Sequence, residues 1–235
     1  MLHTCASTND LLIAQRTPAH RMAVLSSEQQ TAGRGRRGRS WQSWPGGSLL
    51  FSVRWERAAR APTAGLSLAA GVAIAQALES FGTQGLQLKW PNDLLLRGLK
   101  AGGILVEMTQ AGAAQAVVVG VGLNLILPAP LPDEMGIAGV FAAMPSAPTR
   151  EALFARLIQR LLLMRARFDE HGFAAFADEW SARNAHAGAM VCLSGEREAH
   201  VGRFAGVDLE GALLLETPAG LQRLLSGDLS LRERT

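Results

Sequence analysis

The segment AGRGRRGRSW, residues 32–41, restricts the possible folds most, because it carries a phosphate-binding pattern in an unusual context. Its letters GRGRRG satisfy G-x-G-x-x-G, which in a dinucleotide-binding fold leaves a strand and opens a helix whose N-terminus holds the pyrophosphate. Here the chain continues RSWQSWPGGS, and such a run of tryptophans, proline and glycines does not begin a helix. Since the chain also lacks repeated strand–helix alternation and a GxxxxGK(S/T) motif, we exclude the Rossmann and P-loop folds.

Four arginines lie among the glycines of this segment: Arg34, Arg36, Arg37 and Arg39. One interpretation is a solvated charged loop, and another is an arginine–glycine nucleic-acid segment, although such segments are usually longer, repeated and disordered. The regular glycines favour a third interpretation, because glycine lets the backbone adopt positive φ and approach a ligand closely. Arginine forks grip phosphate or carboxylate through two hydrogen bonds. We therefore expect a mobile clamp over an anionic ligand.

The composition is that of an ordinary globular protein. Of 235 residues, 48% are hydrophobic and 18% are charged, and four of the positive charges lie in the arginine segment. The cysteines, Cys5 and Cys192, are far apart and have no metal-ligand spacing, which predicts neither disulfides nor zinc and favours a reducing cytoplasm. The N-terminus has no signal-peptide pattern, and the apolar runs are too short or too rich in glycine and alanine to cross a bilayer. We expect a cytoplasmic protein with no membrane partner.

The spacing of apolar residues predicts an α+β fold with a mixed or antiparallel sheet. Ser7 caps an expected helix in STNDLLIAQR, with Asp10 as its capping-box partner. Further helices are expected over residues 62–81, opened by Pro62, and over residues 150–170 and 172–184. Strands are expected in RMAVLSSEQ, in SLLFSVRW, around the turns WPND and RGLK, and in AVVVGVGLNLIL, which is apolar on both faces like a central strand.

The pattern changes at about residue 188. Short β-like runs such as MVCLSG, AHVGRFAGV and GALLLET are separated by glycine turns, which predicts a small antiparallel barrel. We therefore expect a catalytic domain over residues 1–187 and a small β-barrel domain over residues 188–235, joined near NAHAG.

Three further segments place polar residues beside expected strands. KWPND carries Lys89, Asn92 and Asp93 around a turn, KAGGILVE carries Lys100 before a glycine pair, and GVGLN places Asn124 inside an apolar strand. Each residue alone has an ordinary structural role in a turn, hairpin or bulge. Together, two lysines, an acid, two amides and an arginine clamp suit the activation of a carboxylate by a nucleoside triphosphate, where negative charge grows at the α-phosphate.

The order of these segments resembles that of the biotin protein ligases. The matching segments are STN (7–9), QTAGRGRRGRSW (30–41), KWPNDLLL (89–96), KAGGILVE (100–107), GVGLN (120–124) and, in the C-terminal domain, GALLLE (211–216). The resemblance implies a class II synthetase-like biotin/lipoate ligase catalytic domain followed by an SH3-like β-barrel. It also implies the reaction: MgATP and biotin form biotinyl-5′-AMP, and a lysine of a biotin carboxyl carrier domain then takes the biotinyl group and releases AMP.

The resemblance assigns roles position by position. Biotin-binding residues are Ser7, Thr8, Asn9 and Gln30 at the ureido ring, Gly33, Arg34, Gly35 and Arg36 in the closing loop, Trp41 at the apolar end, Lys100 at the carboxylate, and Gly103 and Gly120 beneath the ligand. ATP-binding residues are Arg36, Arg37, Arg39, Lys89, Asn92 and Asn124. The catalytic residues are Lys100, Arg36, Asp93 and Lys89, and Mg²⁺ is held through the ATP phosphates with Asp93 and Asn124 as further ligands.

Two features depart from the family pattern. Relatives that repress transcription carry a winged-helix domain before the STN motif, whereas Ser7 lies almost at the start of this chain, so we expect a monofunctional ligase with no specific DNA partner. Many relatives also cover the adenine with a tryptophan after the GVGLN strand, where this chain offers Ile137 or Phe141 in MGIAGVF. A monomer and a homodimer both fit the sequence. The alternatives are a lipoate or octanoate transferase of the same superfamily and a non-catalytic binding module.

Overall fold

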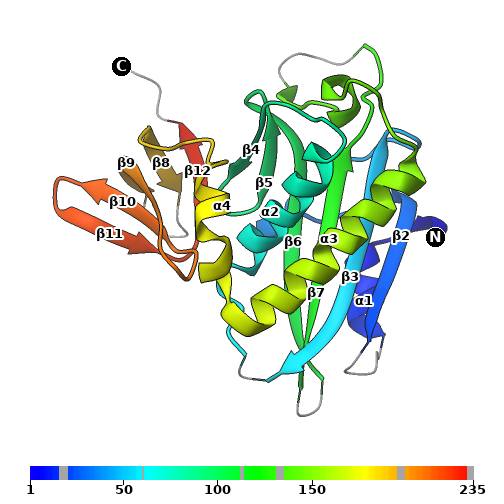
Figure 1. Ribbon diagram of the computed structural model, residues 1–235, viewed down its shortest axis with the longest axis horizontal. Coiled ribbons are helices and arrows are strands. Elements are labelled where there is room, and N and C mark those ends of the chain that lie inside the picture. Colours follow the sequence, from blue (N-terminus) through cyan, green and yellow to red (C-terminus); the bar gives the residue numbers. More distant parts are fainter. Residues whose placement is uncertain (16–20, 60, 112–113, 131–134, 195–198, 232–235) are drawn as a thin grey trace.

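The computed structural model describes residues 1–15, 21–59, 61–111, 114–130, 135–194 and 199–231. They form a seven-stranded sheet in the order β1-β2-β3-β7-β6-β5-β4 and a five-stranded antiparallel sheet in the order β11-β10-β9-β8-β12. In the large sheet, β1 is parallel to β2 and the remaining neighbours are antiparallel. The expected mixed sheet with a small antiparallel C-terminal domain is therefore confirmed (Figure 1).

The elements of the large domain follow the chain in a simple order. The strands are β1 (Leu2–Cys5), β2 (Met22–Gln30), β3 (Ser48–Ala58), β4 (Leu86–Lys89), β5 (Asp93–Leu96), β6 (Leu99–Ala111) and β7 (Ala114–Asn124). The main helices are α1 (Thr8–Ala14), α2 (Leu66–Glu79) and α3 (Arg150–His171). As predicted, Ser7 caps α1 by accepting a hydrogen bond from the Asp10 backbone N–H.

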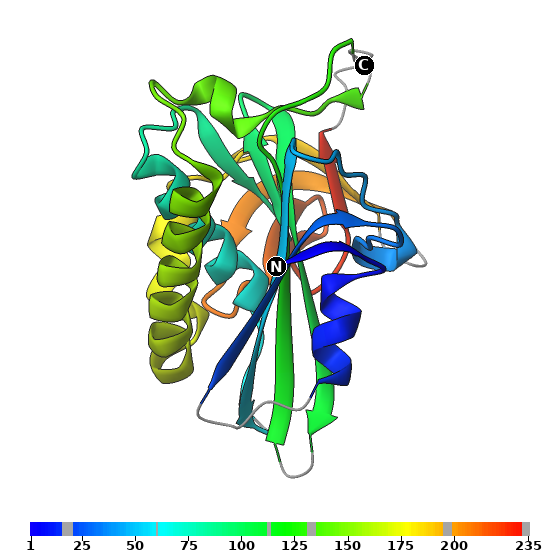
Figure 2. The ribbon, with the colours of Figure 1, turned by 90° about the vertical axis from the view of Figure 1, so that its right-hand side faces the viewer.

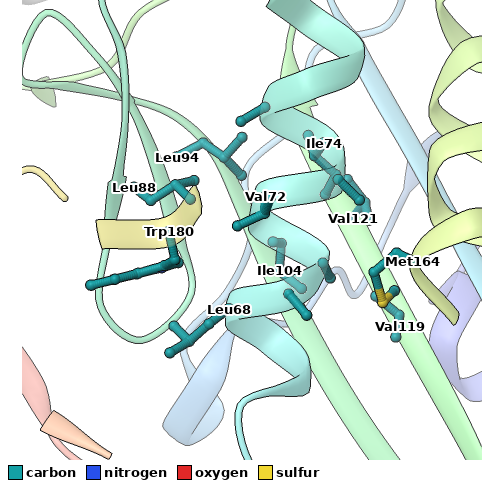
Figure 3. Packing of buried hydrophobic residues seen from close by; sticks show 14 of the residues in the cluster. Leu68, Val72, Ile74, Leu88, Leu94, Ile104, Val119, Val121, Met164 and Trp180 are labelled. Carbon is teal, nitrogen blue, oxygen red and sulfur yellow. The ribbon is translucent and has the colours of Figure 1, made fainter. Parts of the chain in front are cut away.

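The helices cover the two faces of the sheet unequally. Helices α2 and α3 lie together on one face, and α1 lies on the other, close to the N-terminus (Figure 2). Apolar residues of α2, among them Leu68, Val72 and Ile74, pack with Ile104 and Val121 of the central strands (Figure 3). Strand β3 is buried on both faces, since Phe51 and Val53 on one face and Ser52 on the other have no exposed surface. Ser52 therefore faces α1, and Phe51 faces α3 on the other side of the sheet.

The helix predicted over residues 62–81 is shorter than expected at its N-terminus. Pro62 does not open the helix; its carbonyl accepts a hydrogen bond from Arg57, and the helix begins at Leu66 after Gly65. Gly65 has φ 74, and a Cβ there would lie 2.5 Å from the Phe173 side chain. The turn before α2 is therefore set by packing against a distant segment, which local sequence does not reveal.

The helix predicted over residues 172–184 is also interrupted. Gly172, with φ 64, ends α3, and the chain continues as a 3-10 turn η4 (Phe173–Phe176) and a short helix α4 (Ala177–Ser181). Residues 184 and 185 then extend the edge of the large sheet, with Asn184 beside Leu88 and the Ala185 N–H donating to the Leu88 carbonyl. The pairing with β4 replaces the last helical turn.

The small sheet contains β8 (Met190–Ser194), β9 (Ala199–Val207), β10 (Leu213–Thr217), β11 (Gly220–Leu224) and β12 (Asp228–Leu231). It packs against the large domain near α4, where the rings of Trp180 and Phe204 lie 6.4 Å apart. The Trp90 indole N–H also donates to the Gly211 carbonyl at 3.1 Å. These contacts bring β12 towards the arginine segment. Among the described residues, no helix has the length and hydropathy needed to cross a membrane.

Candidate active site

One pocket gathers most of the residues that the sequence singled out. It encloses about 810 Å³ of space between atoms, part of it open to solvent. Fourteen of the predicted residues line it: Ser7, Thr8, Asn9, Gln30, Arg34, Gly35, Arg36, Arg39, Trp41, Asn92, Asp93, Lys100, Gly103 and Gly120. Residues from α1, β2, the arginine segment and strands β5 to β7 therefore meet at a single site.

The floor of the pocket is polar but uncharged. The Thr8 backbone N–H donates to Gln30 Oε1 at 2.6 Å, and the Thr8 hydroxyl lies 3.0 Å from the same oxygen. Behind them, the Ser52 hydroxyl lies 2.7 Å from the Thr8 hydroxyl and donates to Asn9 Oδ1 at 2.6 Å. Thr8, Asn9 and Ser52 are all buried, so this network is screened from bulk water and fixes the floor in one arrangement.

Three glycines leave open space on the sheet surface next to this floor. Cross-strand pairing places Gly103 opposite Gly122 and places Gly120 opposite Ser52, so all of them face the α1 side of the sheet. A Cβ at Gly120 would lie 2.2 Å from Asn9 Oδ1, and one at Gly122 would lie 2.5 Å from the Trp41 ring. The glycines therefore provide the space that the Asn9 amide and the Trp41 indole occupy.

A charged pair lies at the other end of the pocket. Lys100 Nζ lies 2.7 Å from Asp93 Oδ1, and the same ammonium group lies 5.6 Å from the centre of the Trp41 ring. The Asn92 side chain donates to the Ile104 carbonyl at 3.0 Å, which fixes the turn that carries Asp93. Lys100 is thus held between a carboxylate and an aromatic face, an arrangement that positions its cation.

The arginine segment closes over the pocket as a small hairpin. Arg34 pairs with Ser40, the Gly35 N–H donates to the Arg39 carbonyl, and Arg37, with φ 55, forms the tip. The guanidinium of Arg36 donates to the Gly227 carbonyl at 3.3 Å, and burial lowers the pKa of this group, although Asp228 opposes the shift. The hairpin thus contacts the small C-terminal sheet.

Protein carboxylates already pair with the arginines of this hairpin. Arg34 contacts Asp10 and lies 3.0 Å from Glu107, while Arg39 lies 2.7 Å from Asp228 on β12. Acids from α1, β6 and the C-terminal sheet thus offset much of the positive charge of the hairpin, although none of them lies near the segment in sequence.

Four predicted residues lie outside the lining of this pocket. Gly33 and Arg37 belong to the hairpin, and Lys89 borders a small neighbouring pocket together with Asn92 and Asp93. Asn124 donates to the Lys100 carbonyl at 3.4 Å, and its Oδ1 atom is buried without a hydrogen-bond partner among the described residues. Neither candidate adenine contact lines this pocket: the Ile137 backbone pairs with Lys100, and Phe141 packs on the core.

Seven further residues that the sequence did not single out line the pocket: Ser40, Phe51, Ile104, Leu105, Val121, Gly122 and Asp228. Gly122 carried a usable signal, since it is the second glycine of GVGLN and lies two residues from Gly120 on the same strand face. Asp228 carried none, because it reaches the pocket only through the packing of the C-terminal sheet.

Fold and pocket together define a class of protein: an α+β domain with a ligand pocket on one face of its sheet, followed by a small antiparallel sheet that touches the pocket. The chain belongs to the biotin/lipoate A/B protein ligase family, whose model matches residues 4–124. A model described as the biotin protein ligase C-terminal domain matches residues 191–232.

Relatives resemble the chain along nearly its whole length. It is 35% identical over 233 residues to a biotin--[acetyl-CoA-carboxylase] ligase of Paracoccus denitrificans, covering 94% of this chain and 95% of that protein. It is 34% identical over 233 residues to the bifunctional ligase/repressor BirA of Escherichia coli, covering 96% of this chain and 71% of that protein. A biotin protein ligase from Aquifex aeolicus, solved in complex with biotin and ATP, superposes with a TM-score of 0.83 at 27% identity and covers 98% of this chain and 97% of its own.

Proposed function

We propose that this chain is an ATP-dependent biotin–[carboxyl-carrier-protein] ligase. It activates biotin as biotinyl-5′-AMP and transfers the biotinyl group to a lysine of a carrier domain. The relatives carry names that state this activity, and the Aquifex ligase was solved with both small substrates. The family also includes lipoate ligases, so the pocket itself must argue for biotin.

The observation that carries the proposal is the division of the pocket into three zones. Thr8, Asn9 and Gln30 form an uncharged polar floor, Trp41 supplies apolar surface, and Lys100 and Arg36 supply positive charge. Biotin has a polar uncharged ureido ring, an apolar chain and a terminal carboxylate, which match these zones in turn. A lipoyl or octanoyl chain would leave the buried polar floor without partners, which is costly.

The residues supply binding and electrostatics for both steps. In the first step, a biotin carboxylate oxygen attacks the α-phosphorus of ATP, and the bond to pyrophosphate breaks. Lys100 lies where negative charge gathers on the carboxylate and α-phosphate, and Arg36 and Arg39 flank the phosphates. In the second step, a lysine amine attacks the mixed anhydride and AMP leaves. Asp93 forms an ion pair with Lys100 in the free protein and is placed to orient the incoming amine.

Magnesium enters with ATP. The described part of the chain has no group of three or more His, Cys, Asp or Glu side chains that could hold a metal by themselves. A magnesium ion bound through phosphates needs only one or two protein oxygens beside water. Asp93 and the unpartnered Asn124 Oδ1 fit that need, and when bound the ion neutralises phosphate charge.

The remaining assignments follow from this function. The macromolecular substrate is a biotin carboxyl carrier domain, and the enzyme works in the cytoplasm without a specific DNA or membrane partner, as a monomer or homodimer. Residues 1–187 form the catalytic domain and residues 188–235 the small domain. Gly33, Arg37 and Lys89 support the hairpin and the nucleotide end from outside the lining.

Biotin-dependent exchange of labelled pyrophosphate into ATP tests the first step. Incubation with labelled biotin, ATP and a carrier domain tests the second, with a carrier whose lysine is replaced by arginine as the control. Equal or faster exchange with lipoate or octanoate would overturn the biotin assignment. Absence of exchange with all three acids would overturn the ligase activity.

A further inference from the structure

The Asn9 side chain has three of its four hydrogen-bonding positions occupied by the protein. Its Oδ1 atom accepts from the Ser52 hydroxyl at 2.6 Å. Its Nδ2 group donates to the Leu105 carbonyl at 3.3 Å and to Glu107 Oε2 at 2.8 Å. An amide has two donor hydrogens and two acceptor lone pairs. One lone pair of Oδ1 therefore remains, on a side chain that lines the pocket and has only 4% of its surface exposed.

The orientation of this amide is specified at its Nδ2 end, because a hydroxyl such as that of Ser52 can either donate or accept. If the amide were rotated by 180°, its oxygen would face the Leu105 carbonyl and the Glu107 carboxylate, both of which only accept hydrogen bonds. The Ser52 hydroxyl donates its proton to Asn9, so it can only accept from Thr8. The Thr8 hydroxyl therefore shares its single proton between Ser52 and Gln30. Donors and acceptors along this network are consistent only when Asn9 Oδ1 faces Ser52.

Neither Ser52 nor Glu107 lines the pocket. Ser52 lies on β3 with no exposed surface, and Glu107 lies on β6 with 23% of its side chain exposed. Gly120 leaves the space that Asn9 occupies, because a Cβ there would overlap the amide. Two residues behind the wall thus determine which atom of Asn9 the ligand meets.

We propose that Ser52 and Glu107 are positioning residues that make Asn9 an obligate hydrogen-bond acceptor, so that the floor of the pocket selects a ligand with a ring N–H donor. This inference rests on the proposed function and identifies the group of biotin that the site recognises, a ring N–H. Ser52 holds the oxygen in place, and Glu107 prevents the amide from turning over. An alternative is that both residues only stabilise the fold, in which case ligand selectivity is independent of them.

The test compares biotin with two cyclic-carbamate analogues, in each of which oxygen replaces one ring N–H. Dissociation constants are measured by calorimetry, and KM and kcat by pyrophosphate exchange. The wild-type protein is expected to disfavour one of the two analogues by about 100-fold, because a ring oxygen facing Asn9 Oδ1 leaves both acceptors unpaired. In the analogue that still binds well, the oxygen replaces the ring N–H that does not donate to Asn9.

Two variants separate positioning from stability. Ser52→Ala should raise KM for biotin by about 10-fold, leave kcat and KM for ATP unchanged, and reduce the preference over the disfavoured analogue to about 10-fold. Glu107→Gln offers a donor to an inverted Asn9 amide, so it should also reduce that preference. Glu107 is partly exposed and the substitution is isosteric, so this variant keeps the test decisive if Ser52→Ala fails to fold.

Ser48→Ala is the matched control. Ser48 is also fully buried on β3, but its hydroxyl accepts from the Trp44 backbone N–H and lies outside the Asn9 network. Its removal should lower the melting temperature without changing the ratio between biotin and the analogues. Unchanged analogue preference in both Ser52→Ala and Glu107→Gln would overturn the positioning role. A wild-type protein that binds no biotin would instead overturn the proposed function.

Discussion

Asp93 Oδ1 lies 2.7 Å from Lys100 Nζ, across the hairpin that joins β5 to β6. The turn of this hairpin places Arg97 and Gly98 in the left-handed region, with φ 51 and φ 83. An opposite charge at this distance holds the ammonium group in a defined position before substrate binds. In the proposed reaction, Asp93 releases Lys100 to the biotin carboxylate and α-phosphate and becomes free for the carrier amine.

Lys100→Ala should reduce adenylate formation by roughly 10²–10³-fold while biotin still binds more weakly, because one fixed cation is lost where negative charge develops. Pyrophosphate exchange measures the rate, and calorimetry measures biotin binding. Lys100→Arg retains the charge but not its position and should recover only part of the rate. Exchange near the wild-type rate in Lys100→Ala would exclude the catalytic role.

Asp228→Asn should loosen the arginine hairpin, because Arg39 and Arg37 lose their carboxylate partner on β12. Cleavage by an arginine-specific protease between Arg34 and Arg39 should become faster in the variant, and biotin plus ATP should slow it in both proteins. Cleavage products are identified by mass spectrometry. If the variant and wild type are cut at the same rate without ligand, the contact with the C-terminal sheet does not hold the hairpin.

Arg36→Ala should let biotinyl-5′-AMP escape, since this side chain covers the pocket and contacts the C-terminal sheet at Gly227. Escaped mixed anhydride labels exposed amines, so lysines of an added bystander protein should become biotinylated. The chain itself has two lysines, Lys89 and Lys100, so self-labelling should stay low. Streptavidin blotting after incubation with biotin and ATP measures both. A bystander that stays unlabelled would show that adenylate retention does not depend on Arg36.

Gly122→Ala should displace the Trp41 ring, because the added Cβ would lie 2.5 Å from it. Loss of the apolar wall should raise KM for biotin by about 10-fold, the effect of losing contacts of roughly 1.4 kcal/mol. The double variant with Trp41→Leu and Gly122→Ala removes the overlapping ring atoms. It should have a higher melting temperature than Gly122→Ala alone, but its KM for biotin should stay raised. A wild-type KM in Gly122→Ala would contradict the placement of Trp41.

Acid should destabilise the protein through His186, which is buried beside Lys89 at the junction with the C-terminal sheet. Burial, and then the positive charge of Lys89, lower the pKa of His186. The unfolded chain, with an ordinary pKa of about 6.5, then binds a proton that the folded chain does not. Stability is therefore complete above about pH 6.5 and is lost as the pH falls below it.

The measurement for His186 is urea unfolding at about pH 7.5 and about pH 5.5. His186→Gln should flatten the difference between the two, while the same substitution at His200 on β9 should leave it unchanged. An equal loss of stability in His186→Gln and wild type would assign the acid sensitivity to other groups.

The sequence by itself determined the elements whose signal is local. Alternating apolar residues identified β3, and a continuous apolar run identified β7. Ser7 and Asp10 identified the start of α1. Each of these signals depends on neighbours within a few residues. The resemblance in ordered motifs identified fourteen residues that line one pocket.

Only the tertiary structure decided the features that depend on distant partners. The start of α2 is set by Gly65 against Phe173, and the last predicted turn after α4 is replaced by pairing with β4. Asp228 meets the arginine hairpin from almost two hundred residues away, and Ser52 and Glu107 hold Asn9 from two different strands. Local propensity and motif spacing encode none of these contacts, because packing free energy between remote segments selects them.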